Sequence, residues 1–397
     1  KVESVVPLHP IAETILNRLR EEEEQAVFMV PTELLAEQHA ANIRRLLGGL
    51  PVRVETLTSK MPAADKRASL QAIADGSADL IIGTHAVFQE QVRYARLALV
   101  VIDEQHRFGV HQRLQLQDKT APGASVHQLV LTATPIPRTL AMSHYGELDC
   151  SIIDALPAGR QPIQTSVVSN QKRDAVIARV GENCRAGRQA YWVCPLIEES
   201  DTLECENAEA TAAQLQAMLP DIRVALLHGR MTNDQRQATM NAFVAGEAQL
   251  LVATTVIEVG VDVANATLMI IENAERFGLA QLHQLRGRVG RGSTQSYCLL
   301  MYQPPPGETA QRRLRIMRET TDGFRIAEED LAIRGAGELL GTRQTGDATF
   351  RVARLPRDGD LLGETERLTR ELREHHPDYC ETLLTRWTAS REKYLNA

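Results

Sequence analysis

Two adjacent carboxylates follow an apolar run in the segment LVVIDEQHRFG, residues 99–109. Asp103 and Glu104 close a stretch that has the composition of a buried strand, and His106 follows them. At a strand end, the first carboxylate of such a pair can hold hydrated Mg²⁺ while the second activates a water for attack on a phosphoryl group. A solvated acidic loop after a strand would give the same pattern, so this segment alone leaves both interpretations open.

Threonines stand at the ends of two other apolar segments. These are VLTATPIPRTL (residues 130–140), with Thr132 and Thr134, and VATTVIEVGVDV (residues 252–263), with Thr254, Thr255 and Asp262. Hydroxyl groups at strand ends can hydrogen-bond a phosphate, and an acidic side chain nearby suits a ribose hydroxyl. A buried strand followed by a polar turn explains either segment when it is taken alone.

Arginine and glycine alternate in QLHQLRGRVGRG, residues 281–292. The planar guanidinium fork suits phosphate oxygens, and an arginine inserted across a cleft can stabilise transition-state charge, with rate effects of about 10³ to 10⁵ in other enzymes. We expect Arg286, Arg288 and Arg291 on a tight helix opened by glycines. The alternative is a basic surface helix without a catalytic role.

The composition of the 397 residues is that of a soluble globular protein, with 43% hydrophobic and 24% charged residues. The length suggests two or three domains. No apolar run approaches the roughly 18 residues of a membrane-spanning helix, and the first residues do not form a signal peptide. The net charge of −7 does not announce a polyanionic partner, although arginines gathered on one face could still bind one.

Six scattered cysteines form no C-x-x-C pair. This pattern favours reduced thiols and a cytoplasmic location over a zinc site or a disulfide framework.

Strands and helices alternate in the first half of the chain. We expect a helix over 11–24, a second over 32–49 with Thr32 as its N-cap and Gly48 at its end, and strands over 25–31, 78–84 and 98–104. This alternation predicts a parallel sheet with helices on both faces, in which ligands bind at the carboxyl ends of the strands.

The same pattern restarts after a proposed linker, DALPAGRQPIQT, residues 154–165. Strands are expected over 188–197, 222–229, 248–263 and 266–274. Two helices joined at Asp322–Gly323, a glycine-rich loop and closing helices over 363–376 and 381–397 follow. The predicted fold is therefore α/β, with two tandem parallel-sheet lobes (1–156 and 163–305) followed by a helical hairpin and C-terminal helices (306–397).

In their order, these segments resemble the motif series of superfamily 2 helicases, which have two RecA-like lobes. The series comprises PTELLAEQ, GTHAVF, DEQH, TATP, LLHGRM, ATTVIEVGVDV and QLRGRVGR. More narrowly, IDEQHRFGVHQR, TATPIPRTLAM, QAYWVCPLIEES and RGAGELLGTRQTG resemble the RecG family of branched-DNA translocases. This second resemblance extends over essentially the whole chain after about residue 25.

The resemblance implies an ATP site. Asp103 would hold Mg²⁺ with ATP, Glu104 would activate the hydrolytic water, and His106 would relay the nucleotide state to Thr132 and Thr134. In the second lobe, the residues implied in nucleotide binding or coupling are Gln284, Asp262, Arg288 and Arg291, of which the two arginines would contact the phosphates.

The resemblance also implies a DNA-facing surface. The residues expected to contact the DNA backbone are Thr32, Glu33, Gly83, Thr84, His85, Thr254 and Thr255. A translocation element would comprise the hairpin with Arg312, Arg315 and Arg318 and the loop with Arg343 and Gln344. A hairpin that serves only packing is the alternative.

Two features of the RecG family are missing from the sequence. No G-x-x-x-x-G-K-[ST] loop precedes the strand expected over 25–31, where KVESVVPLHPIAETIL stands instead, and no N-terminal OB-type wedge domain is present. Glycine-rich loops supply much of the phosphate binding, so we expect weak ATP binding. Both gaps fit a fragment or an interrupted gene.

The leading hypothesis is an ATP-dependent motor that acts on branched double-stranded DNA, such as stalled forks and Holliday junctions, in recombination and repair. We expect a monomer with no membrane association and single-stranded DNA-binding protein as a possible partner. The alternatives are a transcription-repair coupling translocase and a non-catalytic DNA-binding remnant of a helicase.

Overall fold

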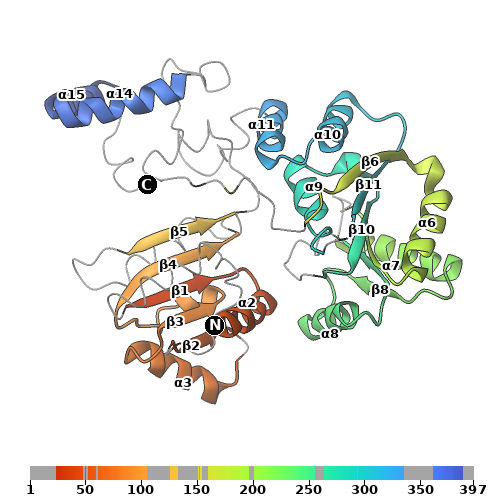
Figure 1. Cartoon of the computed structure of the whole chain (residues 1–397), viewed down its shortest axis with the longest axis horizontal. Coiled ribbons are helices and arrows are strands. Elements are labelled where there is room, and N and C mark those ends of the chain that lie inside the picture. The colour runs from red at the N-terminus through yellow and green to blue at the C-terminus, as the bar shows by residue number, and fades with distance from the viewer. Residues whose placement is uncertain are drawn as a thin grey trace, which may run out of the picture. The chain divides into compact units, whose positions relative to one another are not determined.

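The computed structural model contains two separate β-sheets, followed by C-terminal helices (Figure 1). The residues that it describes are 24–47, 50, 52–59, 61–104, 126–132, 151, 153, 160–195, 201–254, 263–292, 294–334 and 361–387. Two RecA-like lobes built on parallel strands are therefore present, as the sequence predicts.

The first sheet has the strand order β2-β3-β1-β4-β5, with every neighbouring pair parallel. Its strands are β1 (Gln25–Met29), β2 (Val54–Leu57), β3 (Leu80–Gly83), β4 (Leu97–Asp103) and β5 (His127–Leu131). Its helices are α2 (Glu33–Leu46), α3 (Ala63–Ala74) and the 3₁₀ helix η1 (His85–Phe88).

Both faces of this sheet are buried, which explains why its central strands are continuous apolar runs. Alternate residues of β1 belong to two separate cores. Val27 and Met29 pack in the core that includes Ile73 of α3, whereas Ala26 and Phe28 pack in the core that includes residues of α2. The helices on opposite faces thus account for the absence of a polar alternation in β1.

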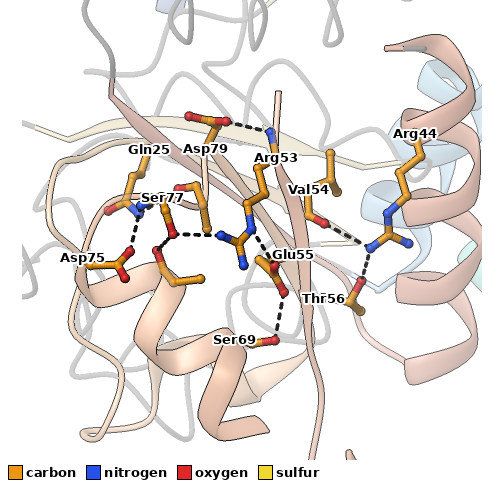
Figure 2. Close-up of polar contacts among 12 residues, drawn as sticks. Gln25, Arg44, Arg53, Val54, Glu55, Thr56, Ser69, Asp75, Ser77 and Asp79 are labelled. Carbon is orange, nitrogen blue, oxygen red and sulfur yellow. Dashed lines mark hydrogen bonds and ion pairs between the residues drawn. The ribbon is translucent and has the colours of Figure 1, made fainter. Parts of the chain in front are cut away.

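Polar side chains tie the edge strand β2 to the elements around it (Figure 2). Arg44 of α2 donates from Nη2 to the carbonyl of Val54 and to Thr56 Oγ1, each at 3.1 Å. On the same strand, Glu55 accepts from Arg53 Nε at 3.0 Å and from Ser69 Oγ at 2.9 Å. Charged groups on an exposed edge disfavour pairing with another chain.

The second sheet has the order β6-β11-β10-β7-β9-β8, and β10 pairs in parallel with both β7 and β11. Its strands are β6 (Gln164–Ser169), β7 (Gln189–Val193), β8 (Val224–Leu227), β9 (Leu250–Ala253), β10 (Ala266–Ile271) and β11 (Tyr297–Tyr302). Its helical elements are η3 (Asn170–Lys172), α6 (Arg173–Arg185), α7 (Asp201–Met218), α8 (Asn233–Val244), η5 (Ala274–Arg276) and α9 (Leu279–Arg286).

Among the described residues, the helices that follow the second sheet in sequence are α10 (Glu308–Glu319), α11 (Gly323–Arg334), α14 (Leu362–His375) and α15 (Pro377–Trp387). The hairpin of α10 and α11 packs on the second lobe, because α10 contacts β6 and η5 while α11 contacts α9. Helices α14 and α15 contact each other. In the described parts of the chain, no helix is long and apolar enough to cross a membrane.

The proposed linker extended too far. Residues 154–165 were expected to connect the lobes, but β6 begins at Gln164 and pairs with β11 from that residue onward. Because the segment QTSVVS is rich in polar residues, its sequence did not indicate that it forms an edge strand. The helix expected over 11–24 lies almost entirely outside the described residues.

Candidate nucleotide site and DNA-facing residues

The carboxyl edge of the first sheet gathers several of the predicted site residues. β4 ends at Asp103, which pairs in register with Leu131 of β5, and Thr132 follows on that neighbouring strand. Thr32 follows β1, and Thr84 follows β3. Because these strands are parallel neighbours, residues far apart in the sequence end at one edge, where ligands of α/β sheets bind.

Asp103 has a neighbour that the sequence did not indicate. The Nε2 atom of His39, on α2, lies 3.8 Å from Asp103 Oδ2, and the His39 ring packs edge-on against Phe28 at 4.8 Å between centroids. Burial lowers the pKa of His39, which favours its neutral form. A neutral His39 would not form an ion pair with Asp103, although the two side chains are neighbours.

Glu104 adopts a left-handed backbone conformation with φ of 54°. Such a conformation is unfavourable for a glutamate, by about 1–3 kcal/mol, and strained residues of this kind cluster at functional sites. A simple solvated turn would favour glycine or asparagine here. The strain supports the catalytic interpretation of the Asp103–Glu104 pair over the acidic-loop alternative.

The carboxylates at this edge fit Mg²⁺ bound together with a nucleotide. Such ions take one or two protein carboxylates and complete their coordination with phosphate oxygens and waters. Asp103 is 25% exposed in its side chain and is followed directly by Glu104. Within the described part of the chain, no group of three or more His, Cys, Asp or Glu residues could hold a metal by itself.

Thr32 caps the helix that leaves this edge. Its hydroxyl accepts a hydrogen bond from the amide of Leu35 at 3.4 Å, and Glu33 begins α2. This confirms the predicted N-cap and shows that the Thr32 side chain already has a structural role. Its contact with DNA stays a prediction.

The segment Gly83–His85 combines packing and exposed residues. A Cβ atom on Gly83 would lie 2.1 Å from the carbonyl oxygen of Leu57, so only glycine fits between β2 and β3 there. Thr84 is buried, whereas His85 is exposed at the start of η1. Of these three residues, His85 is the one whose side chain is accessible to a DNA backbone.

The arginine-rich segment differs from its expected form. α9 ends at Arg286, so Arg288 and Arg291 follow the helix rather than lying on it. Gly290 has φ of 73°, a left-handed conformation that a right-handed helix cannot contain, so the helical backbone does not continue through this segment. Gln284 lies on α9, Arg288 is buried, and Arg291 Nε contacts the carbonyl of Gly287 at 3.4 Å.

This segment also lies at the amino edge of the second sheet rather than at its carboxyl edge. Gly290 is adjacent to Ile163, just before β6, and Gly292 is adjacent to the carbonyl of Ala264, just before β10. The positive charges of Arg288 and Arg291 act on Tyr191 of β7, whose pKa burial nevertheless raises to about 12. Because both act on Tyr191, the predicted nucleotide-binding residues Arg288 and Arg291 lie close together in the fold.

Arg286 connects α9 to the helical hairpin, a role that sequence reasoning missed. The Nη1 atom of this buried arginine donates to the carbonyls of Met317 at 2.9 Å and Thr320 at 2.8 Å. Its Nη2 atom lies 3.0 Å from Nδ1 of His283, whose pKa is lowered to about 4 mainly by burial. Neutral His283 can accept this bond at Nδ1. Because Arg286 lies on α9 and donates to carbonyls at the end of α10, its side chain joins the two helices.

The predicted arginines of the hairpin have different environments. Arg312 pairs with Glu329 of α11 and so braces the two helices. Arg315 and Arg318 are exposed on α10, whereas Leu314, Ile316 and Met317 are buried. The exposed pair is accessible to DNA, while Arg312 also serves packing.

The remaining site predictions divide in two groups. Thr254 is buried directly after β9 and donates from its amide to the carbonyl of Leu227 at 3.2 Å. The others lie outside the described residues; they are His106, Thr134, Thr255, Asp262, Arg343 and Gln344.

Three family models match consecutive parts of the chain. They are the DEAD/DEAH box helicase model at 4–143, the helicase conserved C-terminal domain at 171–293, and the domain 3 C-terminal model of ATP-dependent DNA helicase RecG at 320–385. The chain belongs to the RecG family of DNA helicases. The transcription-repair coupling translocase is not favoured by these matches.

Relatives and a solved structure agree with this assignment. The chain is 56% identical to ATP-dependent DNA helicase RecG of Escherichia coli K12 over 94% of its own length and 54% of that protein. For RecG of Bacillus subtilis 168, the identity is 48% over 86% of the chain and 50% of that protein. A structure of RecG bound to a three-way DNA junction matches with a TM-score of 0.71 and 40% identity, over 89% of the chain and 45% of that structure. The chain thus spans about half the length of these RecG proteins.

Proposed function

We propose that this chain is the ATP-dependent motor part of a RecG-type enzyme that acts on branched double-stranded DNA. The observation that carries the proposal is the arrangement of Asp103, Glu104 and Thr132 at one carboxyl edge of the first sheet. The RecG structure with a three-way junction supports branched DNA as the substrate class.

In the proposed mechanism, Asp103 would hold the Mg²⁺ that accompanies ATP, and Glu104 would orient a water for attack on the γ-phosphate. The bound Mg²⁺ would neutralise charge that develops on the phosphate oxygens. Arg288 and Arg291 would stabilise the same charge from the second lobe. The Arg286 contacts with Met317 and Thr320 give α9 a direct route to the hairpin.

The hairpin would convert changes at the nucleotide site into movement on DNA, which it would contact through the exposed side chains of Arg315 and Arg318. His85 would contact the DNA backbone from the first lobe. A monomeric state and a contact with single-stranded DNA-binding protein are parts of the proposal that rest on the family resemblance alone.

Phosphate release by the full chain, measured with and without a three-way junction at saturating ATP, tests the proposal. Glu104→Gln should reduce junction-stimulated release at least about 10²-fold because the water loses its general base. Glu90→Gln, at an exposed glutamate in the same lobe, is the matched control and should leave the rate unchanged. Junction binding without release by the unsubstituted chain would contradict the motor and support a non-catalytic remnant.

A further inference from the structure

The end of the connection between the two lobes contacts the loop that carries Arg291. Arg160 lies in this connection, and its Nε atom donates to the carbonyl of Gly290 at 2.8 Å across 130 positions of sequence. The acceptor belongs to the peptide bond that joins Gly290 to Arg291. A side chain in the connection thereby fixes the backbone immediately before the proposed catalytic arginine.

Further contacts join the same two segments. Gln295 Nε2 donates to the carbonyl of Pro162 at 2.8 Å, and the amide of Gln164 donates to the carbonyl of Ser296 at 3.0 Å. Residues 160–164 are therefore hydrogen-bonded to both ends of the loop 290–296.

Close packing reinforces this attachment. Gly290 is buried and left-handed, and a Cβ atom there would lie 2.9 Å from Ile163 Cγ1. Gly292 is equally restricted, since a Cβ atom would lie 2.8 Å from the carbonyl oxygen of Ala264. The loop around Arg291 thus fits against its neighbours without space for a side chain at either glycine.

We propose that Arg160 is a positioning residue for Arg291, through which the connection between the lobes sets the geometry of the catalytic arginine. This inference rests on the proposed function, because it assigns the role of Arg291 in phosphate chemistry. Arg160 itself touches no reacting atom. Its guanidinium holds the Gly290 peptide next to Arg291, so loss of this hydrogen bond would change the position of Arg291.

Hydrogen exchange of the full chain tests the structural half of the proposal. Arg160→Gln should speed exchange of peptides within 287–296 about tenfold, as expected when a hydrogen bond from a charged donor is lost, while β10 stays protected. Gln295→Ala, which removes the bond to Pro162, should speed exchange in the same loop. Arg185→Gln is the matched control, since Arg185 forms an exposed pair with Asp221 in the same lobe. If Arg160→Gln leaves the exchange rate of peptides within 287–296 unchanged, the proposal is overturned.

Junction-stimulated phosphate release tests the catalytic half. Arg160→Gln should lower kcat about tenfold or more with less than about a twofold change in KM for ATP, since a small displacement of a catalytic group slows the chemical step. In the Arg291→Gln background, Arg160→Gln should have no further effect. An equal effect in both backgrounds, or a change in KM alone, contradicts positioning.

The hydrogen-exchange and phosphate-release experiments distinguish a failure of the Arg160 proposal from a failure of the proposed function. If the unsubstituted chain releases no phosphate, the motor proposal fails, while the exchange experiment still decides whether Arg160 holds the loop. If Arg291→Gln hydrolyses ATP normally, Arg291 is not catalytic, and the positioning role of Arg160 is overturned with it.

Discussion

Glu104 and Gly83 occupy two backbone positions at the same sheet edge for opposite physical reasons. Glu104 has the left-handed conformation of a glycine but carries a carboxylate, and this strain fits its proposed role in activating a water. Gly83 has no side chain because β2 approaches too closely for one. The first residue points to chemistry, and the second points to packing, although both stood in predicted motifs.

Gly83→Ala should destabilise the protein by about 3 kcal/mol, at the upper end of the usual range for overpacked cores, since its Cβ would meet the backbone of Leu57. Urea unfolding measures this change. Gly229→Ala is the control, because a Cβ there meets nothing within 4 Å. Equal midpoints for the two variants would contradict the close approach.

His283 should make stability depend on pH. Its pKa is about 4 in the folded protein and 6.5 in its ordinary state, so the unfolded chain binds the proton more tightly. The stability contributed by neutral His283 is present above pH 6.5 and is lost as the pH falls toward 4.

Between pH 7.5 and 5.5 this loss should reach about 1 kcal/mol, as measured by urea unfolding. His283→Leu removes the titrating group and should lower the pH dependence by that amount. Arg286 and Asp322 are the charged groups that act on His283. The free energies of unfolding of His283→Leu and of the unsubstituted protein are therefore compared at each pH. An unaltered pH profile in His283→Leu would exclude this residue as the cause.

At the scale of elements, α9 is the part of the second lobe that connects the proposed nucleotide site with the hairpin. Gln284 lies on it, Arg288 and Arg291 follow it, and Arg286 bonds the end of α10. Hydrogen bonds from one buried guanidinium to backbone carbonyls give this connection a fixed geometry.

Arg286→Gln should remove these bonds and leave the carbonyls of Met317 and Thr320 without this donor. The expected loss of stability is about 2–3 kcal/mol, because the unmade bonds belong to a charged donor with one buried and one partly buried acceptor. Differential scanning calorimetry measures it, with Arg185→Gln as the exposed control. A loss no larger than that of the control would show that α9 and the hairpin are joined by other contacts.

The strands that the sequence predicts are mainly apolar runs, and they include the edge strand β8. The sequence did not predict β2, β6 or the interior strand β11. β1, β3, β4 and β10 are apolar runs because both faces of each sheet are covered. β2 and β6 lie at sheet edges, and their segments VETL and QTSVVS contain polar residues that conceal a strand.

The same distinction applies to the site. Asp103 and Glu104 could be predicted because a strand end and a carboxylate pair are adjacent in sequence. His39, Arg286 and Arg160 could not, since their roles depend on contacts with segments that are distant in the sequence. The arginine motif led us to expect all three arginines on a helix. Arg288 and Arg291 instead follow α9, because helical spacing alone does not reveal the left-handed turn at Gly290.

At the scale of the whole molecule, an acidic chain that binds DNA must do so through a locally basic surface. The exposed arginines of α10 fit this requirement despite the net charge of −7. Contacts with phosphates release counterions, and affinity therefore falls with salt.

The logarithm of the affinity for a three-way junction should fall linearly with the logarithm of salt concentration. Replacing both Arg315 and Arg318 with glutamine should reduce this slope by about 2, which corresponds to two phosphate contacts. Fluorescence anisotropy over a salt series measures it, with Arg185→Gln as the control. An unchanged slope in the double variant would place the DNA-binding surface elsewhere.

In the proposed function, this chain couples ATP hydrolysis to branched DNA through a catalytic arginine. The most direct test of this coupling is phosphate release by the full chain and by Arg291→Gln, each with and without a three-way junction, together with junction affinity. We predict junction-stimulated release that Arg291→Gln lowers about 10³-fold while junction affinity changes less than about twofold. Equal losses of release and affinity, or stimulated release that persists in Arg291→Gln, would contradict this prediction.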